Sequence, residues 1–154
     1  MALLQILQVG DERLRQISQP VTSFDLNLSN LLNDMKETLI KAKGAGLAAP
    51  QVGVLSRVFV VNVEEGYFEF INPVILGVSG SQYGVEGCLS VKGKWGDVKR
   101  PKKVTVKAQD RFGKWFKIVA KDFFAKAICH EYDHLDGKLY IDIADNLRDE
   151  DAEE

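Results

Sequence analysis

The sequence predicts an α+β fold in which several strands occupy the middle of the chain and one helix lies on each side of them. Three patterns indicate this order. Apolar residues recur at helical spacing between residues 28 and 42, β-branched and aromatic residues dominate from residue 57, and a second helical stretch covers residues 122–137. Because 154 residues can bury one sizeable core, we expect a single domain over residues 1–154.

The first elements are an extended arm and a helix. Residues 1–24 contain turn signals but no periodic pattern, which predicts the arm. The helix starts close to three residues that can cap it: Asp25, Asn27 or Ser29. Gly44 stands where a helix commonly ends in a left-handed residue. The apolar stripe between these ends predicts a packing helix without a chemical role.

A run of small residues, GAGLAAPQVG at positions 44–53, follows this helix. Its glycines and alanines allow the backbone to approach a neighbour closely, and Gln51 is its only side chain able to donate hydrogen bonds. A nucleotide-binding loop would follow a strand and carry GxGxxG or a P-loop lysine, and this run has neither. Taken alone, the run predicts a tight connection.

Short strands are expected between residues 57 and 120, separated by turn residues. They cover residues 57–63, 67–71, 74–78, 104–108 and 115–120. Asn72-Pro73 separates the second strand from the third, and residues 110–114 form a hairpin turn. Residues 80–87 are expected to be irregular, and the glycines at 93 and 96 predict an exposed loop around Trp95. Residues 148–154 are acidic and predict a mobile tail.

Charge and composition exclude several classes of partner. Twenty basic and 22 acidic side chains give a net charge of −2, which argues against nucleic acid as the main partner and against a polybasic membrane anchor. The N-terminal residues do not resemble a signal peptide, and no apolar run approaches membrane-spanning length. Two cysteines are too few for a disulfide framework, which suits a reducing cytoplasm.

The strongest chemical pattern is AKAICHEYDHLDG, residues 125–137. It holds the only two histidines, His130 and His134, at a spacing that places both imidazoles on one face of a helix. Two such imidazoles can share a metal ion, and Glu131 can reach a water on that metal. Gly137 is expected to end the helix. The pattern predicts a metal site but does not identify the reaction.

A catalytic metal usually has three protein ligands and one open position, so a third donor is needed. The extended metalloprotease pattern HExxHxxGxxH would place it at position 140, which is tyrosine. A downstream glutamate could serve instead, but the glutamates are confined to the unpatterned tail: Glu150, Glu153 and Glu154. Cys88, within EGCLS, offers a thiolate, although an isolated cysteine is more often a small buried residue. Cys129 points about a hundred degrees away from His130 and favours the core.

Three motifs resemble those of the peptide deformylase family: GAGLAAPQ at 44–51, EGCLS at 86–90 and HEYDH at 130–134. They occur in the family's order and approximate spacing, and the resemblance spans nearly the whole chain. It implies an α+β fold with antiparallel or mixed sheets packed around a central metal-binding helix. It also implies a monomeric cytoplasmic hydrolase that removes the formyl group from N-formylmethionyl nascent polypeptides, with ribosome-associated action.

The resemblance implies that Cys88, His130 and His134 hold one divalent ion. It favours Fe(II) in the cell, whereas the ligand types also accept Zn, Ni or Co. Such an ion lowers the pKa of its water to about 7. Glu131 would then take the proton of that water and return it to the departing amine.

The resemblance also places groups around the substrate. The side-chain amide of Gln51 and the backbone N–H of Leu89 are implied as donors to the oxygen that gains charge. Gly46 and Gly87 would let the substrate backbone lie as an added strand. Candidate walls of the methionine pocket lie on the helix face of His130: Phe123 and Ala127.

Other neighbours of the site are less closely specified. Glu86 and Arg100 are candidates for a supporting ion pair, and Asp133 is a candidate for a contact beside the metal ligands. Lys92 and Cys129 depart from the family, in which proline and glutamine are frequent at these positions. The second departure removes a polar neighbour of the site but no ligand.

Two alternatives remain open at the level of sequence. A zinc endopeptidase could use the same HExxH helix, although its usual downstream ligand is missing. A peptide-binding module could have kept the fold and lost the activity, although five residues of the expected machinery are present: Gln51, Cys88, His130, Glu131 and His134.

Overall fold

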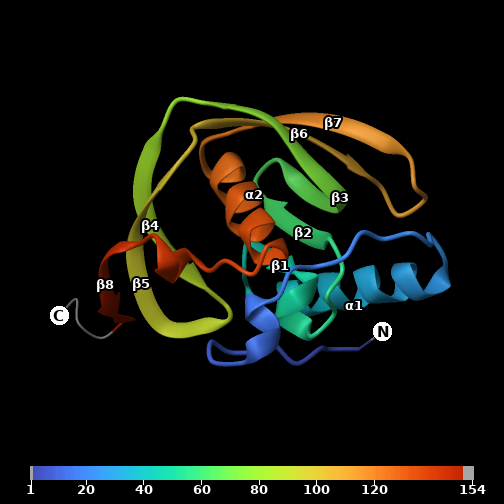
Figure 1. Ribbon diagram of the computed structural model, residues 1–154, viewed down its shortest axis with the longest axis horizontal. Coiled ribbons are helices and arrows are strands. Elements are labelled where there is room, and N and C mark those ends of the chain that lie inside the picture. The colour runs from blue at the N-terminus through green and yellow to red at the C-terminus, as the bar shows by residue number, and fades with distance from the viewer. Residues whose placement is uncertain (1, 151–154) are drawn as a thin grey trace.

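The computed structural model describes residues 2–150, which fold into two antiparallel sheets with helices packed between and beside them (Figure 1). The larger sheet has the strand order β1-β2-β3-β6-β7 and the smaller β4-β5-β8. The larger sheet consists of β1 (Gly46–Ala48), β2 (Val58–Val63), β3 (Gly66–Ser79), β6 (Lys103–Gln109) and β7 (Trp115–Lys121). The smaller consists of β4 (Gln82–Cys88), β5 (Val91–Arg100) and β8 (Asp145–Asp149). The predicted α+β class is confirmed.

Helix α1 (Leu26–Ala42) begins at the first of its three candidate caps, since Asp25 Oδ1 accepts the backbone N–H of Leu28 at 3.1 Å. Its left-handed terminal residue is Lys43 (φ 58°), not Gly44 as predicted. Gly44 is small for another reason, because a Cβ there would lie 2.8 Å from a methyl carbon of Leu89. The other helices are α2 (Asp122–Leu135) and the short 3-10 helices η1 (Glu12–Arg15), η2 (Ala49–Val52) and η3 (Tyr140–Asp142).

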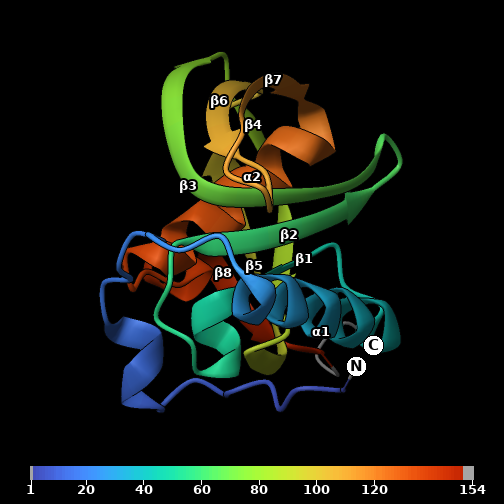
Figure 2. The same cartoon turned by 90° about the vertical axis from the view of Figure 1, so that its right-hand side faces the viewer.

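The larger sheet separates the two long helices (Figure 2). Strand β2 is buried on both faces because its side chains alternate: Val58 and Val60 pack in the cluster of α1, whereas Phe59 and Val61 pack in the cluster of α2. The α1 face contributes four buried apolar side chains: Leu28, Leu32, Met35 and Leu39. Burying such a side chain stabilises the fold by about 1.5–3 kcal/mol each.

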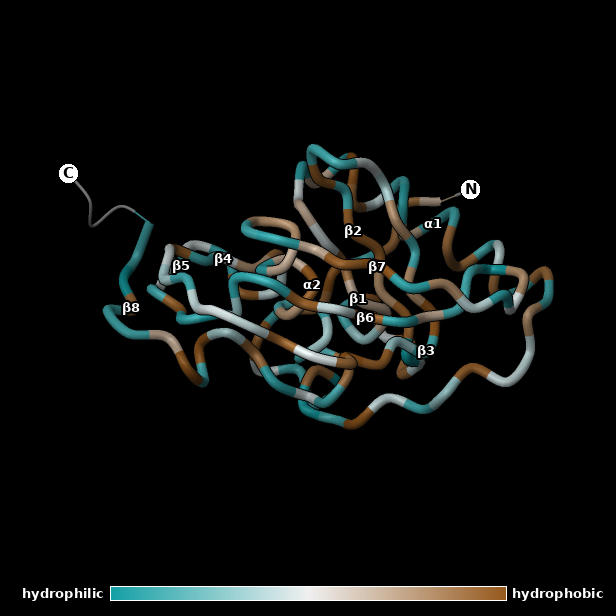
Figure 3. The backbone as a smooth tube through the Cα atoms, turned by 90° about the horizontal axis from the view of Figure 1, so that it is seen from above, coloured by the Kyte–Doolittle hydropathy of each residue, from teal (hydrophilic) through white to brown (hydrophobic). Residues whose placement is uncertain are grey.

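Strands β6 and β7 continue the larger sheet over the far side of α2, so this helix is enclosed (Figure 1). Their inward residues belong to the same buried cluster as the helix: Val104, Val106, Ala108 and Ala120. Hydrophobic segments therefore gather at the centre of the molecule, whereas β8 at its margin is hydrophilic (Figure 3). This enclosure fixes the helix that carries both histidines.

Strand β3 is longer than predicted, because Asn72-Pro73 does not end it. The pairing of β3 with β6 shifts register between Ile71 and Val74, so a bulge accommodates the missing N–H of Pro73. Asn72 adopts a left-handed conformation (φ 51°), and its side chain bonds to Val21 and Gln109. The bulge thus also attaches the N-terminal arm to the sheet.

The prediction for residues 80–100 was wrong. The segment expected to be irregular forms β4, and the expected loop around Trp95 lies inside β5. Two of its glycines reflect close packing, because a Cβ on Gly87 would lie 2.7 Å from the Trp95 ring and one on Gly96 2.7 Å from Ala144. At the C-terminal end, Arg148 and Asp149 belong to β8, not to a tail. Residues 151–154 of the predicted tail lie outside the described residues.

Candidate metal centre

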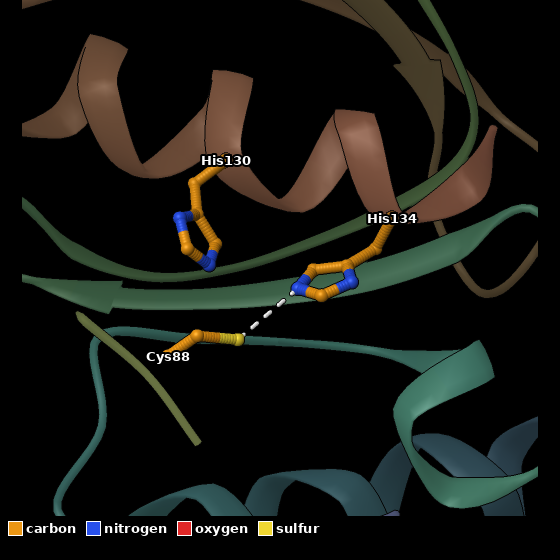
Figure 4. Close-up of side chains that lie close together, drawn as sticks. All are labelled: Cys88, His130 and His134. Carbon is orange, nitrogen blue, oxygen red and sulfur yellow. Dashed lines mark hydrogen bonds between the residues drawn. The ribbon is translucent and has the colours of Figure 1, made fainter. Parts of the chain in front are cut away.

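Three side chains that the sequence places far apart meet between the smaller sheet and α2. Cys88 is the last residue of β4, and Leu89-Ser90 then turns the chain into β5. His130 and His134 come from successive turns of α2 and point towards Cys88 (Figure 4). The three ligand atoms lie within 4.8 Å of one another, and Cys88 Sγ is 3.4 Å from His134 Nε2.

Helix α2 ends one residue after the second histidine, at Leu135. Gly137 adopts φ 73°, as expected of a helix stop, and its N–H is bonded to the carbonyl of His134. A Cβ on Gly137 would also collide with the carbonyl of Arg15. The N-terminal arm and this stop therefore fit together only with glycine.

A buried ion-pair network holds the imidazole of His130 at its Nδ1 atom. Its Nδ1 lies 2.8 Å from Glu86 Oε1, and both Glu86 oxygens accept bonds from Arg100 at 2.8 and 2.9 Å. Arg100 also donates to Asp133 on α2 at 2.7 Å. Burial alone would raise the pKa of Glu86, but its bonds to Arg100 and His130 lower it to about 2. The carboxylate therefore stays charged and fixes the ring of His130.

The two imidazoles differ in their surroundings. Burial favours a lower pKa for His130, but its contacts with Cys88 and Glu86 raise that pKa overall. Burial and the neighbouring charge of His130 lower the pKa of His134, whose Nδ1 has no partner within residues 2–150. A thiolate with two imidazoles is a donor set that suits a divalent transition metal. The residues present therefore fit a metal ion.

Glu131 lies beside this cluster and is 4% exposed. Burial raises the pKa of its carboxyl to about 7, and the charge of His130 opposes that rise. Gly46 on β1 makes room for it, since a Cβ there would lie 2.6 Å from Glu131 Oε2. Oε1 has no hydrogen-bond partner in the described part of the chain. A buried carboxyl with a pKa near neutrality can both accept and return a proton.

Gln51, in η2, is 1% exposed, and both ends of its amide are held. Its Oε1 accepts the backbone N–H of Ala48 at 2.9 Å. Its Nε2 donates to Ser90 Oγ at 3.0 Å and lies 3.6 Å from Cys88 Sγ. The tight connection predicted at residues 44–53 therefore carries an N–H donor to the edge of the cysteine-histidine cluster.

A cavity of about 680 Å³ opens onto the cluster. Its walls include all the residues expected near the substrate: Gly46, Gly87, Leu89, Phe123 and Ala127. Phe123 is 54% exposed, so it is a wall and not a core residue. Trp95 also lines the cavity, and sequence patterns gave it only a loop position.

Sequence reasoning missed two supporting residues. Ser90 bonds to Gln51, and the EGCLS motif was the available signal for it. Tyr140 stacks on His130, with ring centroids 5.9 Å apart, and its hydroxyl donates to the carbonyl of Lys94. The sequence pattern considers Tyr140 only as the residue at the third-ligand position of HExxHxxGxxH, where tyrosine is not the expected ligand. Cys129 packs in the core, where burial raises its pKa to about 11.

Fold and site together define a Cys-His-His metal centre with a buried glutamate, set on a helix between two sheets. Among residues 2–150, no helix is both long and apolar enough to cross a membrane. The family model described as polypeptide deformylase matches residues 3–150, and the chain belongs to this family.

Individual relatives agree over almost the full length. A peptide deformylase of Caldicellulosiruptor bescii is 55% identical over 92% of this chain and 86% of its own. A peptide deformylase of Thermoanaerobacter pseudethanolicus is 48% identical over 100% of this chain and 97% of its own. Crystal structures of peptide deformylases from Legionella pneumophila and Thermotoga maritima superpose with TM-scores of 0.90 and 0.91, at 44% and 38% identity. The match to the Legionella structure covers 94% of this chain and 87% of that one, and the match to the Thermotoga structure covers 93% and 98%.

Proposed function

We propose that this chain is a metal-dependent hydrolase that removes the N-terminal formyl group from formyl-methionyl peptides and releases formate. The observation that carries the proposal is the Cys88-His130-His134 cluster beside buried Glu131, in a chain that the deformylase family model matches almost throughout. The family is metal-dependent, and its relatives carry this activity in their names.

The ion would be held by Cys88 Sγ and by one ring nitrogen from each histidine. When bound, it would act as a Lewis acid that lowers the pKa of water to about 7. Glu86 occupies Nδ1 of His130, which leaves the other ring nitrogen of that histidine to face the ion. We propose Fe(II) as the ion in the cell. Metal analysis of anaerobically purified protein tests this.

Glu131 is the proposed general base and acid. Its pKa of about 7 leaves part of the population ionised at neutral pH, ready to take a proton from the attacking water. The protonated carboxyl then delivers that proton to the departing amine nitrogen. Gly46 keeps the carboxyl against β1, which limits the orientations that it can adopt.

Gln51 and Leu89 are the proposed donors to the formyl oxygen as it gains negative charge. The amide of Gln51 is already oriented by Ala48 and Ser90, so little reorganisation is needed when the charge develops. The backbone of Leu89 lies in the turn that follows Cys88. Removing one such donor typically costs about 2.7–4 kcal/mol of transition-state stabilisation.

The cavity can take an extended peptide between two edge strands. β1 ends the strand order of the larger sheet and β4 ends that of the smaller, and Gly46 and Gly87 of these strands both line the cavity. An added peptide strand could therefore pair with exposed backbone on either side. Phe123 and Ala127 would then border the methionine side chain.

One experiment separates this function from the two alternatives. Anaerobically purified protein is incubated with formyl-Met-Ala-Ser, and formate is measured together with internal peptide cleavage. A deformylase releases formate and leaves the peptide bonds intact. An endopeptidase would cleave internal bonds, and a binding module would release nothing; either result overturns the proposal.

We further propose that the substrates in the cell are nascent chains, met in the cytoplasm near the ribosome. Their formyl groups are present only at the start of new chains, and the free cysteines suit a reducing compartment. We expect a single-domain monomer. Sedimentation with ribosomes and size-exclusion chromatography test these expectations.

A further inference from the structure

The outer part of the cavity is lined by lysines, whereas its inner end carries the metal centre. Four lysines contribute to its walls from three separate elements: Lys43, Lys92, Lys94 and Lys126. We call these four residues the lysine rim. Lys43 ends α1, Lys92 and Lys94 belong to β5, and Lys126 belongs to α2. The rim thus draws on three elements and is not formed by one of them alone.

Little negative charge offsets the lysine rim. Lys94 pairs with Asp149 at 2.6 Å, and Lys126 donates to the neutral carbonyl of Val85 at 2.7 Å. No ion pair within residues 2–150 involves Lys43 or Lys92, and both are exposed. Glu150 is the one acidic residue lining the outer cavity in this part of the chain.

The acidic residues deeper in the cavity do not change this balance. Glu86 pairs with Arg100 at 2.8 Å, and Glu131 is buried beside the cysteine-histidine cluster. Four lysines against Glu150 and Asp149 leave the opening with a net charge of about +2, in a chain whose overall charge is −2. A low-dielectric cavity with one sign of charge at its mouth attracts ligands of the opposite sign.

The rim lies along the path that the proposed substrate would follow. Lys43 precedes the edge strand that contains Gly46, and Lys92 follows the turn after Cys88. With the formyl group at the metal centre and methionine beside Phe123, the next residues of an extended peptide run outwards between these walls. Alternate side chains of that peptide then project towards one wall or the other.

Resting on the proposed function, we propose that the lysine rim makes this enzyme select formylated peptides with Asp or Glu among the second to fourth residues. Lys43 and Lys92 carry most of the preference, because Lys94 and Lys126 already have partners. The substrate carboxylate pairs with an exposed ammonium, so the interaction strengthens binding more than the chemical step.

The test compares formyl-Met-Ala-Asp with its neutral isostere formyl-Met-Ala-Asn, and with formyl-Met-Ala-Lys. At low ionic strength we expect kcat/KM to be three- to tenfold higher for the Asp peptide than for the Asn peptide, mainly through KM, and lowest for the Lys peptide. About 0.5 M salt should remove most of the difference.

The variant Lys43→Asn/Lys92→Gln should bring the Asp/Asn ratio of kcat/KM close to one. Asn is chosen at position 43 because it tolerates the left-handed conformation found there. The matched control is Lys114→Gln/Lys117→Gln, which removes the same charge from exposed positions at the β6–β7 hairpin and should preserve the ratio.

Binding can be followed separately from turnover. Trp95 lines the cavity and Trp115 lies on β7, so Trp115→Phe leaves Trp95 as the single indole reporter. Titration with the product peptides Met-Ala-Asp and Met-Ala-Asn should give the tighter Kd for the first. Equal Kd values, or equal kcat/KM for all three formyl peptides, would overturn the preference while leaving deformylation intact. Absence of formate from every peptide would instead refute the proposed function itself.

Discussion

Helices α1 and α2 pack on opposite faces of the same sheet, yet only α2 carries side chains of the candidate metal centre. The buried face of α1 is apolar except for Thr38, whose hydroxyl bonds to the carbonyl of Asp34 and accepts the N–H of Leu4. The buried face of α2 also contains His130, Glu131 and His134. Burying polar groups is costly unless neighbours supply charge or hydrogen bonds. Strand β4 does so for the two histidines through Glu86 and Cys88.

Each helix is linked to a sheet by one arginine, and the two arginines differ in burial as the two helix faces differ in polarity. Arg111 binds Glu69 of β3 and Asn33 of α1, with its side chain 24% exposed. Arg100 binds Glu86 of β4 and Asp133 of α2, with its side chain 5% exposed. The same device therefore serves packing on one side of the sheet and the orientation of His130 on the other.

The largest expected effect comes from Glu131→Gln on α2. The amide cannot take up a proton, so kcat for formate release should fall by about 10²- to 10⁴-fold while the metal content of the protein is unchanged. The matched change on α1, Glu37→Gln, should leave kcat as it is. If Glu131→Gln kept more than a tenth of the activity, the proposed base would be wrong.

Arg100→Met should cost stability and metal affinity together. It leaves the buried carboxylate of Glu86 without its main partner, and this loss should lower the free energy of unfolding by about 3–5 kcal/mol. Because Glu86 orients His130, competition with a chelator should show about 10- to 100-fold weaker metal binding. Arg111→Met should lower only the free energy of unfolding in urea. Equal metal affinities in the two variants would contradict this division of roles.

Leu32→Ala on α1 should affect stability alone. Leu32 is fully buried, so the cavity left behind should reduce the free energy of unfolding by about 2–5 kcal/mol. The folded fraction should release formate with an unchanged kcat at low temperature. Leu26, which is 73% exposed, provides the control, since Leu26→Ala should change stability by less than about 0.5 kcal/mol. A large loss of kcat in Leu32→Ala would show that α1 also shapes the site.

The smallest effect is expected outside both helices, at the Arg15–Asp142 ion pair. Its 2.6 Å bond from Arg15 holds the pKa of Asp142 below the ordinary value of 3.8. The pair therefore stabilises the fold above that pH, and its contribution is lost as the pH falls through the lowered pKa. Asp142→Asn should lower stability by about 0.2–1 kcal/mol at pH 7 and by less at pH 3, measured by urea unfolding. A difference that grew on acidification would exclude this origin.

Local patterns were sufficient to predict both helices, the β6–β7 hairpin and the two histidines of the candidate metal centre. Helical spacing brings His130 and His134 together whatever the rest of the chain does. The meeting of Cys88 with them depends on long-range packing, and only the resemblance to a family indicated it. Distant packing also explains the failures, since Gly87 and Gly96 suggest loops locally but lie under Trp95 and Ala144 within strands. The lysine rim, assembled from three elements, has no local pattern at all.

Cys88 ends a strand of the smaller sheet, whereas both histidines belong to a helix that packs on the larger one. An ion bound by all three would act as a cross-link that closes the long loop through β5, β6 and β7. Because an ion that binds only the folded chain stabilises it by mass action, the melting temperature should rise with the concentration of free metal. The concentration of free metal would then determine the thermal stability of the protein as well as its catalytic rate.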